Sequence, residues 1–213
     1  MININSKRHR LFDVHRIVVP LLAILFLAAC DRAPTLPRLA SHDVIVAFGD
    51  SLTHGTGASD DTAYPAVLAS LSGRTVINAG VPGDTTESGL QRLPDVLAEY
   101  KPRLVLLCLG GNDMLRKQPE ARTENNLRLL VQTIRASGAN VVLIGVPAPK
   151  LFGGAPDFYA RIADEMQLPL EQDAFNDVLK DNRLKSDPIH ANAAGYRQVA
   201  ERLNEFLKET GAL

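Results

Sequence analysis

The stretch Val44-Ile-Val-Ala-Phe-Gly-Asp-Ser-Leu52 joins a run of five apolar residues to a tight polar turn. The run is continuously apolar rather than alternating, which is typical of a strand covered on both faces. Further runs of this kind occupy residues 75–77, 104–109 and 141–146, and residues 168–170 form a weaker fifth candidate. We therefore expect about five strands, all of them buried.

Amphipathic segments separate these runs. Apolar side chains recur at helical spacing within residues 64–71, 90–100, 127–134, 158–166 and 196–207, and Asn192 is expected to cap the last of these helices. Pro94 leaves the boundary of the second helix uncertain. Strand and helix alternation predicts an α/β fold, with a parallel sheet flanked by helices on both faces. Residues 44–213 are long enough for one such domain.

Polar residues follow the first three runs directly, as Gly49-Asp50-Ser51-Leu52, Asn78-Ala79-Gly80 and Gly110-Gly111-Asn112-Asp113. Ligands bind open parallel sheets outside the carboxyl ends of the strands, so these turns should meet at one site. We expect Ser51 to present its hydroxyl there beside backbone N–H groups. Asp50 and Asp113, the acidic residues in the first and third of these turns, are interpreted as stabilisers of the turns whose side chains bond backbone groups.

A serine nucleophile needs a base, and after residue 29 the chain has three histidines, His42, His54 and His190. His190 ends the sequence Asp187-Pro-Ile-His190, in which one short turn can hold a carboxylate against an imidazole. His54 is expected in a loop near the entrance of the site. No metal-ligand pattern surrounds it.

The four motifs, in this order, resemble the GDSL or SGNH hydrolase family. The resemblance extends over nearly all of residues 44–207 and implies a flavodoxin-like three-layer sandwich. It also implies Ser51 as nucleophile, His190 as general base and acid, and Asp187 as the carboxylate that orients His190. The implied oxyanion hole consists of the amides of Ser51 and Gly80 and the side chain of Asn112. Such preorganised donors stabilise the charge of a tetrahedral intermediate.

Within that family the chain is most similar to the small bacterial type with thioesterase, arylesterase and lysophospholipase activities. The motifs that carry this similarity are Gly83-Asp-Thr-Thr86, Gly89-Leu90, Arg92-Leu-Pro94 and Leu109-Gly-Gly-Asn-Asp113. The resemblance implies hydrolysis of carboxylic esters or thioesters through an acyl-enzyme. Leu115 and Phe152 are candidates for lining an acyl pocket, the latter in a segment that follows the fourth strand.

Two alternatives stay open at this point. The same triad would serve a carbohydrate O-acetyl esterase acting on periplasmic glycans, as some family members do. A ligand-binding lipoprotein without catalysis is the other alternative, although a binding module needs neither a base nor an oxyanion hole. No cofactor is expected, because Gly55-Thr-Gly57 lacks the third glycine of a dinucleotide fingerprint and no phosphate-binding loop occurs.

The first thirty residues differ from the rest of the chain. Four basic residues precede a fourteen-residue uncharged run, 17–30, which is the layout of a signal peptide. The run ends Leu27-Ala-Ala-Cys30, which resembles the bacterial lipobox and implies that Cys30 is acylated and becomes the first residue of the mature protein. Residues 1–29 would then be the signal peptide and residues 30–43 a tether. Fully extended, such a tether spans at most roughly 40 Å.

The expected location is therefore the cell envelope, with the domain lipid-anchored and facing the periplasm. Asp31 resembles an inner-membrane retention signal, but the choice between inner and outer membrane stays open. The whole chain has 23 Lys and Arg against 24 Asp and Glu, a formal net charge of −1, which makes nucleic acid an unsuitable partner. Removing residues 1–29 leaves 19 basic against 23 acidic residues. We expect a monomer whose remaining cysteine, Cys108, is a buried strand thiol.

Overall fold

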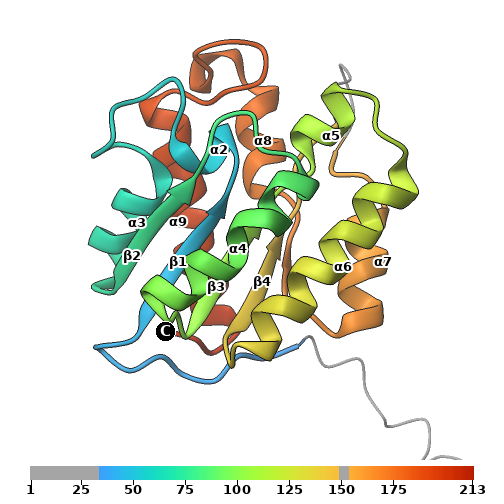
Figure 1. Ribbon diagram of the computed structural model, residues 1–213. Coiled ribbons are helices and arrows are strands. Elements are labelled where there is room, and N and C mark those ends of the chain that lie inside the picture. Colours follow the sequence, from blue (N-terminus) through green and yellow to red (C-terminus); the bar gives the residue numbers. More distant parts are fainter. Residues whose placement is uncertain (1–33, 149–153) are drawn as a thin grey trace, which may run out of the picture. The chain divides into compact units, whose positions relative to one another are not determined.

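The protein's structure, a computed structural model, describes residues 34–148 and 154–213 (Figure 1). Residues 34–213 belong to one compact unit. Its centre is a five-stranded parallel sheet with the strand order β2-β1-β3-β4-β5. The strands are β1 (Val44–Gly49), β2 (Thr75–Gly80), β3 (Leu104–Cys108), β4 (Asn140–Ile144) and β5 (Leu170–Glu171). The expected parallel sheet of five strands is confirmed.

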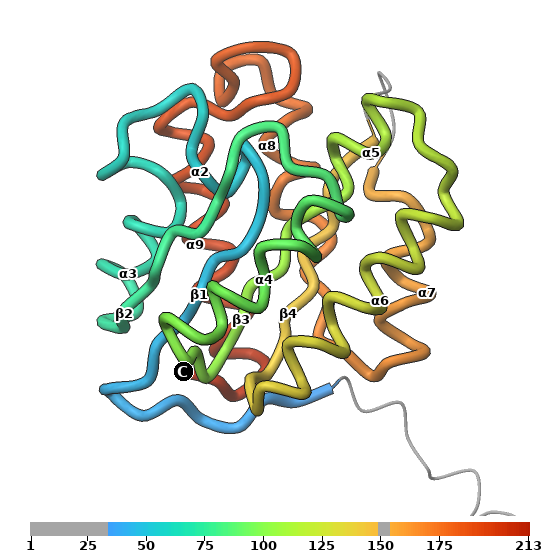
Figure 2. Tube along the Cα trace, viewed as in Figure 1, coloured from blue at the N-terminus to red at the C-terminus, as the bar shows by residue number. Residues whose placement is uncertain are grey.

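Helices cover both faces of this sheet (Figures 1 and 2). On one face lie α4 (Thr86–Tyr100), α6 (Glu120–Ala136) and α7 (Phe158–Met166); on the other lie α3 (Tyr64–Ser72), α8 (Ala174–Lys180) and α9 (Ala193–Glu209). Two short helices, α2 (Ser51–His54) and α5 (Gly111–Leu115), and a 3₁₀ turn, η1 (Asn182–Leu184), complete the described elements. The result is the three-layer sandwich that the sequence predicted.

The strands differ in how far they are covered. The residues of β1, β3 and β4 are buried almost throughout, because helices pack on both of their faces. The expectation of full burial is wrong for β2, which is the edge strand and whose residues are half-buried or exposed. A continuous run of only three apolar residues there cannot distinguish an edge strand from a central one.

Helix α4 begins earlier than its apolar pattern indicates. Thr85 accepts a hydrogen bond from the Ser88 N–H, and the Ser88 hydroxyl accepts one from the Thr85 N–H, which together form a capping box. The helix continues through Pro94. The loss of one donor at Pro94 is therefore tolerated within a capped helix of 15 residues whose apolar side packs on the core.

The segment before β1 is packed against the end of the chain. The Leu36 N–H donates to the Thr210 carbonyl and the Leu39 N–H to the Ala212 carbonyl, both at 2.8 Å, and Leu39 is buried. Arg74, just before β2, donates to the Leu39 carbonyl. The expectation that residues 30–43 form a tether is therefore wrong from residue 34 onward, since two leucines provide enough apolar surface to dock this segment.

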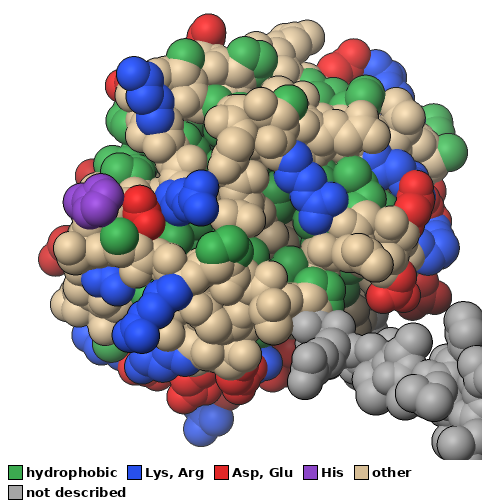
Figure 3. Space-filling view, turned by 90° about the horizontal axis from the view of Figure 1, so that it is seen from below, with side chains coloured by type: hydrophobic (Ala, Val, Ile, Leu, Met, Phe, Trp, Pro, Cys, Tyr) green, Lys and Arg blue, Asp and Glu red, His purple; other side chains and the backbone are tan. Residues whose placement is uncertain are grey.

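This docked segment lies at the amino-terminal end of the strands, near the C-terminus (Figures 1 and 2). The molecule viewed from that end shows acidic and basic side chains interspersed (Figure 3). Among residues 34–148 and 154–213, no helix has both the length and the apolar character to span a bilayer. Cys108 is a buried free thiol, as expected.

Candidate active site

The sequence around Ser51 creates a sharp passage from β1 into α2. Asp50 caps the helix, with its Oδ1 accepting the Leu52 N–H at 3.0 Å. Gly49 is required just before it, because a Cβ atom there would lie 2.5 Å from the Cys108 carbonyl oxygen of β3. The turn thus places Ser51 at the carboxyl edge of the sheet, as expected.

A second segment carries His190 to the same edge. His190 Nε2 lies 2.9 Å from Ser51 Oγ, and its Nδ1 lies 2.7 Å from Asp187 Oδ2. The other carboxylate oxygen of Asp187 accepts the N–H groups of Ile189 and His190, both at 2.9 Å. The structure therefore joins Ser51, His190 and Asp187 in one hydrogen-bonded chain, although 139 residues separate the first two.

The hydrogen bonds favour a charged Asp187. Partial burial raises its pKa, but the bonds from the His190 ring and the two backbone N–H groups outweigh burial and leave the pKa below its ordinary value. Asp187 is thus an anion at neutral pH, which holds the proton of His190 on Nδ1 and turns Nε2 toward Ser51 as an acceptor. This is the arrangement that a serine nucleophile needs.

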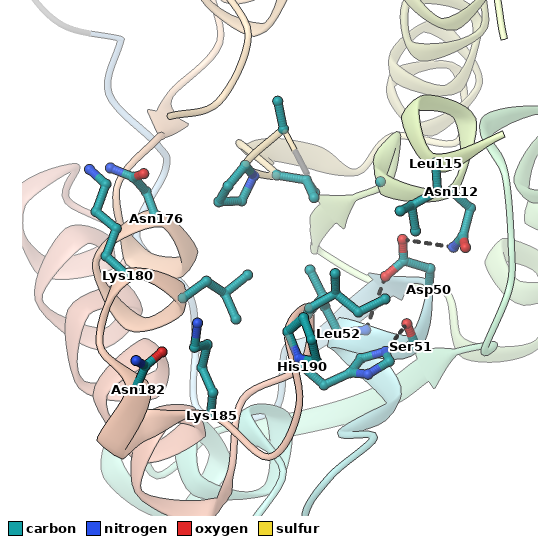
Figure 4. A pocket seen from close by; sticks show the side chains of 17 residues that line it. Asp50, Ser51, Leu52, Asn112, Leu115, Asn176, Lys180, Asn182, Lys185 and His190 are labelled. Atoms are coloured by element: carbon teal, nitrogen blue, oxygen red, sulfur yellow. Dashed lines mark hydrogen bonds between the residues drawn. The ribbon is translucent and has the colours of Figure 1, made fainter. Parts of the chain in front are cut away.

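Asn112 lies beside the nucleophile on α5. Its Nδ2 donates to the Asp84 carbonyl at 2.9 Å. It also donates to Asp50 Oδ2 at 3.3 Å (Figure 4). Asp50 is 2% exposed. Burial raises its pKa to about 7, against the opposing effects of the Leu52 N–H and the nearby charge of His190. The negative charges of Asp84 and Asp113 add to the rise.

Asp113 bonds backbone and side-chain groups in the way the sequence indicated. Its Oδ2 accepts the Thr86 N–H at 2.9 Å and its Oδ1 accepts the Thr86 hydroxyl at 2.6 Å. Asn126 on α6 donates to that same hydroxyl. This buried network ties the start of α4 to α5, so it fixes the loop that precedes α4 against the helix that carries Asn112.

Gly80 does not occupy the place that the resemblance implied. Its N–H donates to the side-chain oxygen of Asn78 at 3.0 Å, and a Cβ atom on Gly80 would lie 2.1 Å from the His54 nitrogen. This glycine permits β2 to pack closely against α2. Together with the exposed His54 it lines a second cavity of about 330 Å³, separate from the pocket at Ser51. Gly80 as an oxyanion donor is therefore wrong, and His54 faces that second cavity rather than the entrance.

Gly83 lies in the turn that joins β2 to α4. The Asp84 N–H donates to the Val81 carbonyl at 3.1 Å, closing a turn with proline and then glycine at its centre, and Gly83 has φ of +84°. Its carbonyl accepts Arg116, and the next carbonyl accepts Asn112. Within the described part of the chain, the N–H groups of Gly83 and Ser51 have no acceptor. The Pro-Gly pair was the sequence signal for this turn.

Ser51 and His190 line a pocket of about 790 Å³ (Figure 4). Leu115 lines it, as expected, and is 45% exposed. Phe152 lies outside the described residues. The other lining residues are Asp50, Ser51, Leu52, Gly111, Asn112, Val146, Pro147, Ala148, Asn176, Leu179, Lys180, Asn182, Lys185, Pro188, Ile189 and His190. Within residues 34–148 and 154–213, no group of three His, Cys, Asp or Glu side chains is placed to hold a metal ion.

The hydrogen-bonded Ser-His-Asp chain at the carboxyl edge of a parallel sheet defines a serine hydrolase of the α/β class. The chain matches the GDSL-like Lipase/Acylhydrolase family over residues 47–198 and belongs to that family. Membership of this family makes it a serine hydrolase of ester bonds.

Individual relatives agree with this assignment. The chain is 36% identical to the thioesterase 1/protease 1/lysophospholipase L1 of Escherichia coli (strain K12) over 179 residues, which is 80% of this chain and 86% of that protein. It is 33% identical to an arylesterase of Vibrio mimicus, covering 76% of this chain and 86% of that one. The crystal structure of TesA superimposes with a TM-score of 0.70 and 30% identity, over 79% of this chain and 99% of that structure.

Proposed function

We propose that this serine ester hydrolase cleaves carboxylic esters and thioesters of apolar acyl groups through an acyl-enzyme on Ser51. The observation that carries the proposal is the chain Ser51 Oγ, His190 Nε2, His190 Nδ1 and Asp187 Oδ2, with distances of 2.9 and 2.7 Å, at the wall of a 790 Å³ pocket. All three residues of this hydrogen-bonded triad come from one copy of the protein, which supports action as a monomer.

The reaction follows from this geometry. Ser51 Oγ attacks the acyl carbon as His190 Nε2 takes its proton, and the imidazolium then gives the proton to the departing alcohol or thiol. The carbonyl oxygen becomes an anion that accepts the N–H groups of Ser51 and Gly83 and one N–H of Asn112. Asn112 supplies that donor by exchanging its longer bond, the one at 3.3 Å to Asp50, for the oxyanion. A water molecule then attacks the acyl-enzyme in the same way, with His190 as the base, and releases the carboxylic acid.

The apolar wall of the pocket supports an acyl substrate. Leu52, Leu115, Val146 and Ile189 line it, and each methylene buried against such a wall contributes about 0.8 kcal/mol, or roughly fourfold in kcat/KM. We expect kcat/KM for p-nitrophenyl esters to rise with acyl length until the wall is covered, and Leu115→Ala to flatten the rise. A strong preference for acetyl over every longer chain would favour the carbohydrate O-acetyl esterase instead.

The catalytic proposal is tested with a fluorophosphonate probe, which labels activated serines. The purified protein should be labelled at Ser51 and should lose p-nitrophenyl butyrate hydrolysis in step with labelling. Ser51→Ala should show neither. A suitable control is Ser59→Ala, since Ser59 is exposed and, among the described residues, its hydroxyl bonds only the side chains of Asp61 and Thr62. Full esterase activity in Ser51→Ala would overturn the mechanism and leave a ligand-binding protein as the alternative.

We also propose that Cys30 carries a lipid and that the enzyme acts in the cell envelope, facing the periplasm. Cys30 lies outside the described residues, so the support is the basic start, the apolar run and the Leu-Ala-Ala-Cys sequence. Cys30→Ser should abolish metabolic labelling with palmitate and release the protein from membranes or leave it unprocessed. Normal processing and membrane retention of that variant would contradict the proposal.

A further inference from the structure

The pocket has two chemically different ends. Ser51, Asn112 and Leu115 lie at one end, while Lys180, Lys185 and two asparagines, Asn176 and Asn182, lie across the cavity (Figure 4). Catalysis as derived above uses none of the residues at this second end. Its basic character contrasts with the net negative charge of the sequence as a whole.

The charges of the two lysines are not neutralised locally. Among the described residues, neither ammonium group lies within 4.0 Å of a carboxylate oxygen. Asp181 lies between them in sequence but bonds Arg183, which lowers the pKa of Asp181 to about 2. Asp187 is held by His190. The lysines therefore present positive charge to the pocket.

The remaining acidic groups do not cancel this charge. Asp177, on α8 three residues before Lys180, is exposed and does not line the pocket. Asp50 does line it, but at the nucleophile's end, with its carboxylate bonded by Leu52 and Asn112 and its pKa raised by burial. A negatively charged ligand would thus meet attraction at the lysine end without an opposing carboxylate.

Asn176 provides a second, independent indication of a ligand. It is 8% exposed, it lines the pocket, and its buried side-chain oxygen has no hydrogen-bond partner among the described residues. Buried amides rarely remain unpaired, because each missing bond costs free energy. Asn176 and Lys180 are four residues apart on α8, so they share one face of that helix. A polar group bound there would engage both side chains.

The position of Lys185 indicates which part of a substrate this end receives. Lys185 pairs with Ala191 in an antiparallel bridge, and the Ser186 N–H donates to the His190 carbonyl at 3.0 Å. Asn192 donates to the Lys185 carbonyl. One short hairpin therefore holds Lys185 together with the imidazole that protonates the leaving group. A leaving group that takes its proton from His190 lies beside this hairpin, so a substituent on it can reach Lys185.

We propose that Asn176, Lys180 and Lys185 form a subsite for an anionic leaving group, and that these three side chains determine how strongly the enzyme favours an ester or thioester whose alcohol or thiol carries a phosphate over its neutral counterpart. The inference rests on the proposed function, because it needs an acyl group on Ser51. Two ammonium groups and an amide N–H are suitable donors for phosphate oxygens, while the Asn176 oxygen accepts a hydroxyl near the phosphate. Lipid headgroups and nucleotide thiols share this chemistry.

The test uses two matched substrate pairs with the full chain. The lipid pair is a monoacylglycerol and the same monoacylglycerol phosphate; the thioester pair is an acyl-N-acetylcysteamine and the same acyl-coenzyme A. In each pair the acyl group and the bond cleaved are the same, so the ratio of kcat/KM for the charged over the neutral member reports the subsite. The variants are Lys180→Gln, Lys185→Gln and their double, with Lys208→Gln as control, an exposed lysine in the last turn of α9.

We expect each single variant to lower the ratio about fivefold, and the double variant more, because each removes one partly exposed charge interaction. Raising the salt concentration should lower the wild-type ratio in the same direction, and Lys208→Gln should leave it unchanged. If the lysine variants lower the ratio of kcat/KM for the lipid pair alone, the subsite binds lipid headgroups. If they lower it for the thioester pair alone, the subsite binds nucleotides. An unchanged ratio for both pairs in the double variant overturns the subsite.

A failure of the proposed function would look different. In that case the neutral member of each pair would either resist hydrolysis by the wild type or be hydrolysed equally well by Ser51→Ala. Circular dichroism of each lysine variant verifies that the fold is retained.

Discussion

Asp50→Asn should make the stability of the protein less dependent on pH. Asp50 has a folded-state pKa of about 7 against an ordinary value of 3.8, because burial disfavours its charge. Below about pH 4 the group is neutral in both the folded and unfolded states. Between pH 4 and 7 only the unfolded chain ionises, so the unfolded state binds fewer protons and wild-type stability falls as the pH rises. Above pH 7 the loss is complete.

The size of the effect follows from the difference in pKa. About three pKa units at 1.36 kcal/mol each correspond to about 4 kcal/mol of stability that the wild type loses across this range. Asparagine does not titrate, so the stability of Asp50→Asn minus that of the wild type should increase by about 4 kcal/mol from pH 4 to pH 8. Any fixed cost of the new amide, such as its contact with Asn112, is the same at each pH and does not affect the slope.

Urea unfolding followed by circular dichroism, at half-unit steps from pH 4 to pH 8.5, measures this difference. Asp95→Asn is the matched control, because Asp95 is exposed on α4 and the same chemical change occurs there without burial. A difference between Asp50→Asn and wild type that stays constant over the whole range would refute the reasoning. It would mean that the carboxyl group ionises in the fold as readily as in the unfolded chain.

Three further predictions concern catalysis. Asn112→Ala should lower kcat by about 10²–10³ with a much smaller change in KM, since its donor acts most strongly on the oxyanion; an effect confined to KM would assign Asn112 to substrate binding. Asp187→Asn should retain more activity than His190→Ala, because the hairpin still orients the ring, and equal loss in both, measured on p-nitrophenyl butyrate, would contradict this. Gly83→Ala should lower kcat and reduce the free energy of unfolding by about 1 kcal/mol, because its φ is positive. Gly80→Ala should reduce the free energy of unfolding more, because its Cβ meets the His54 backbone, but it should affect kcat less. If kinetics and urea unfolding gave the reverse ranking, Gly80 would be restored to the oxyanion hole.

Much of the fold could be predicted because the strands of a parallel sheet carry a strong local signal. The runs that became β1, β3 and β4 are apolar at every position that faces a helix layer, and turn residues mark their ends. Strand β2 carries a weaker signal, since an edge strand needs apolar residues on less of its surface. Likewise, the docking of Leu36 and Leu39 depends on contacts with Thr210 and Ala212, more than 170 residues away, which no local pattern reveals.

The triad could be predicted because its chemistry restricts the choice of residues. A serine after the first strand and an Asp-x-x-His segment have few other interpretations when they occur in one small domain. The glycine that we propose for the oxyanion hole could not be chosen in this way, because Gly80 and Gly83 are only three residues apart, the first at the end of β2 and the second in the turn after it. The hydrogen bonds of the folded chain separate them: the Gly80 N–H donates to Asn78, and the Gly83 N–H has no acceptor among the described residues.

The docking of residues 34–39 also limits where the enzyme can work if Cys30 is acylated. Only the four residues that begin with Cys30 and precede Pro34 then remain as a tether, and four residues span at most about 13 Å. The docked segment lies at the amino-terminal end of the strands, while the Ser51 pocket opens at the carboxyl end. A tether this short would not let the domain rotate far enough to bring the pocket to the membrane in which its lipid is inserted. The enzyme would therefore take its substrates from water or from an opposing surface, and an ester still embedded in its own bilayer would be out of reach.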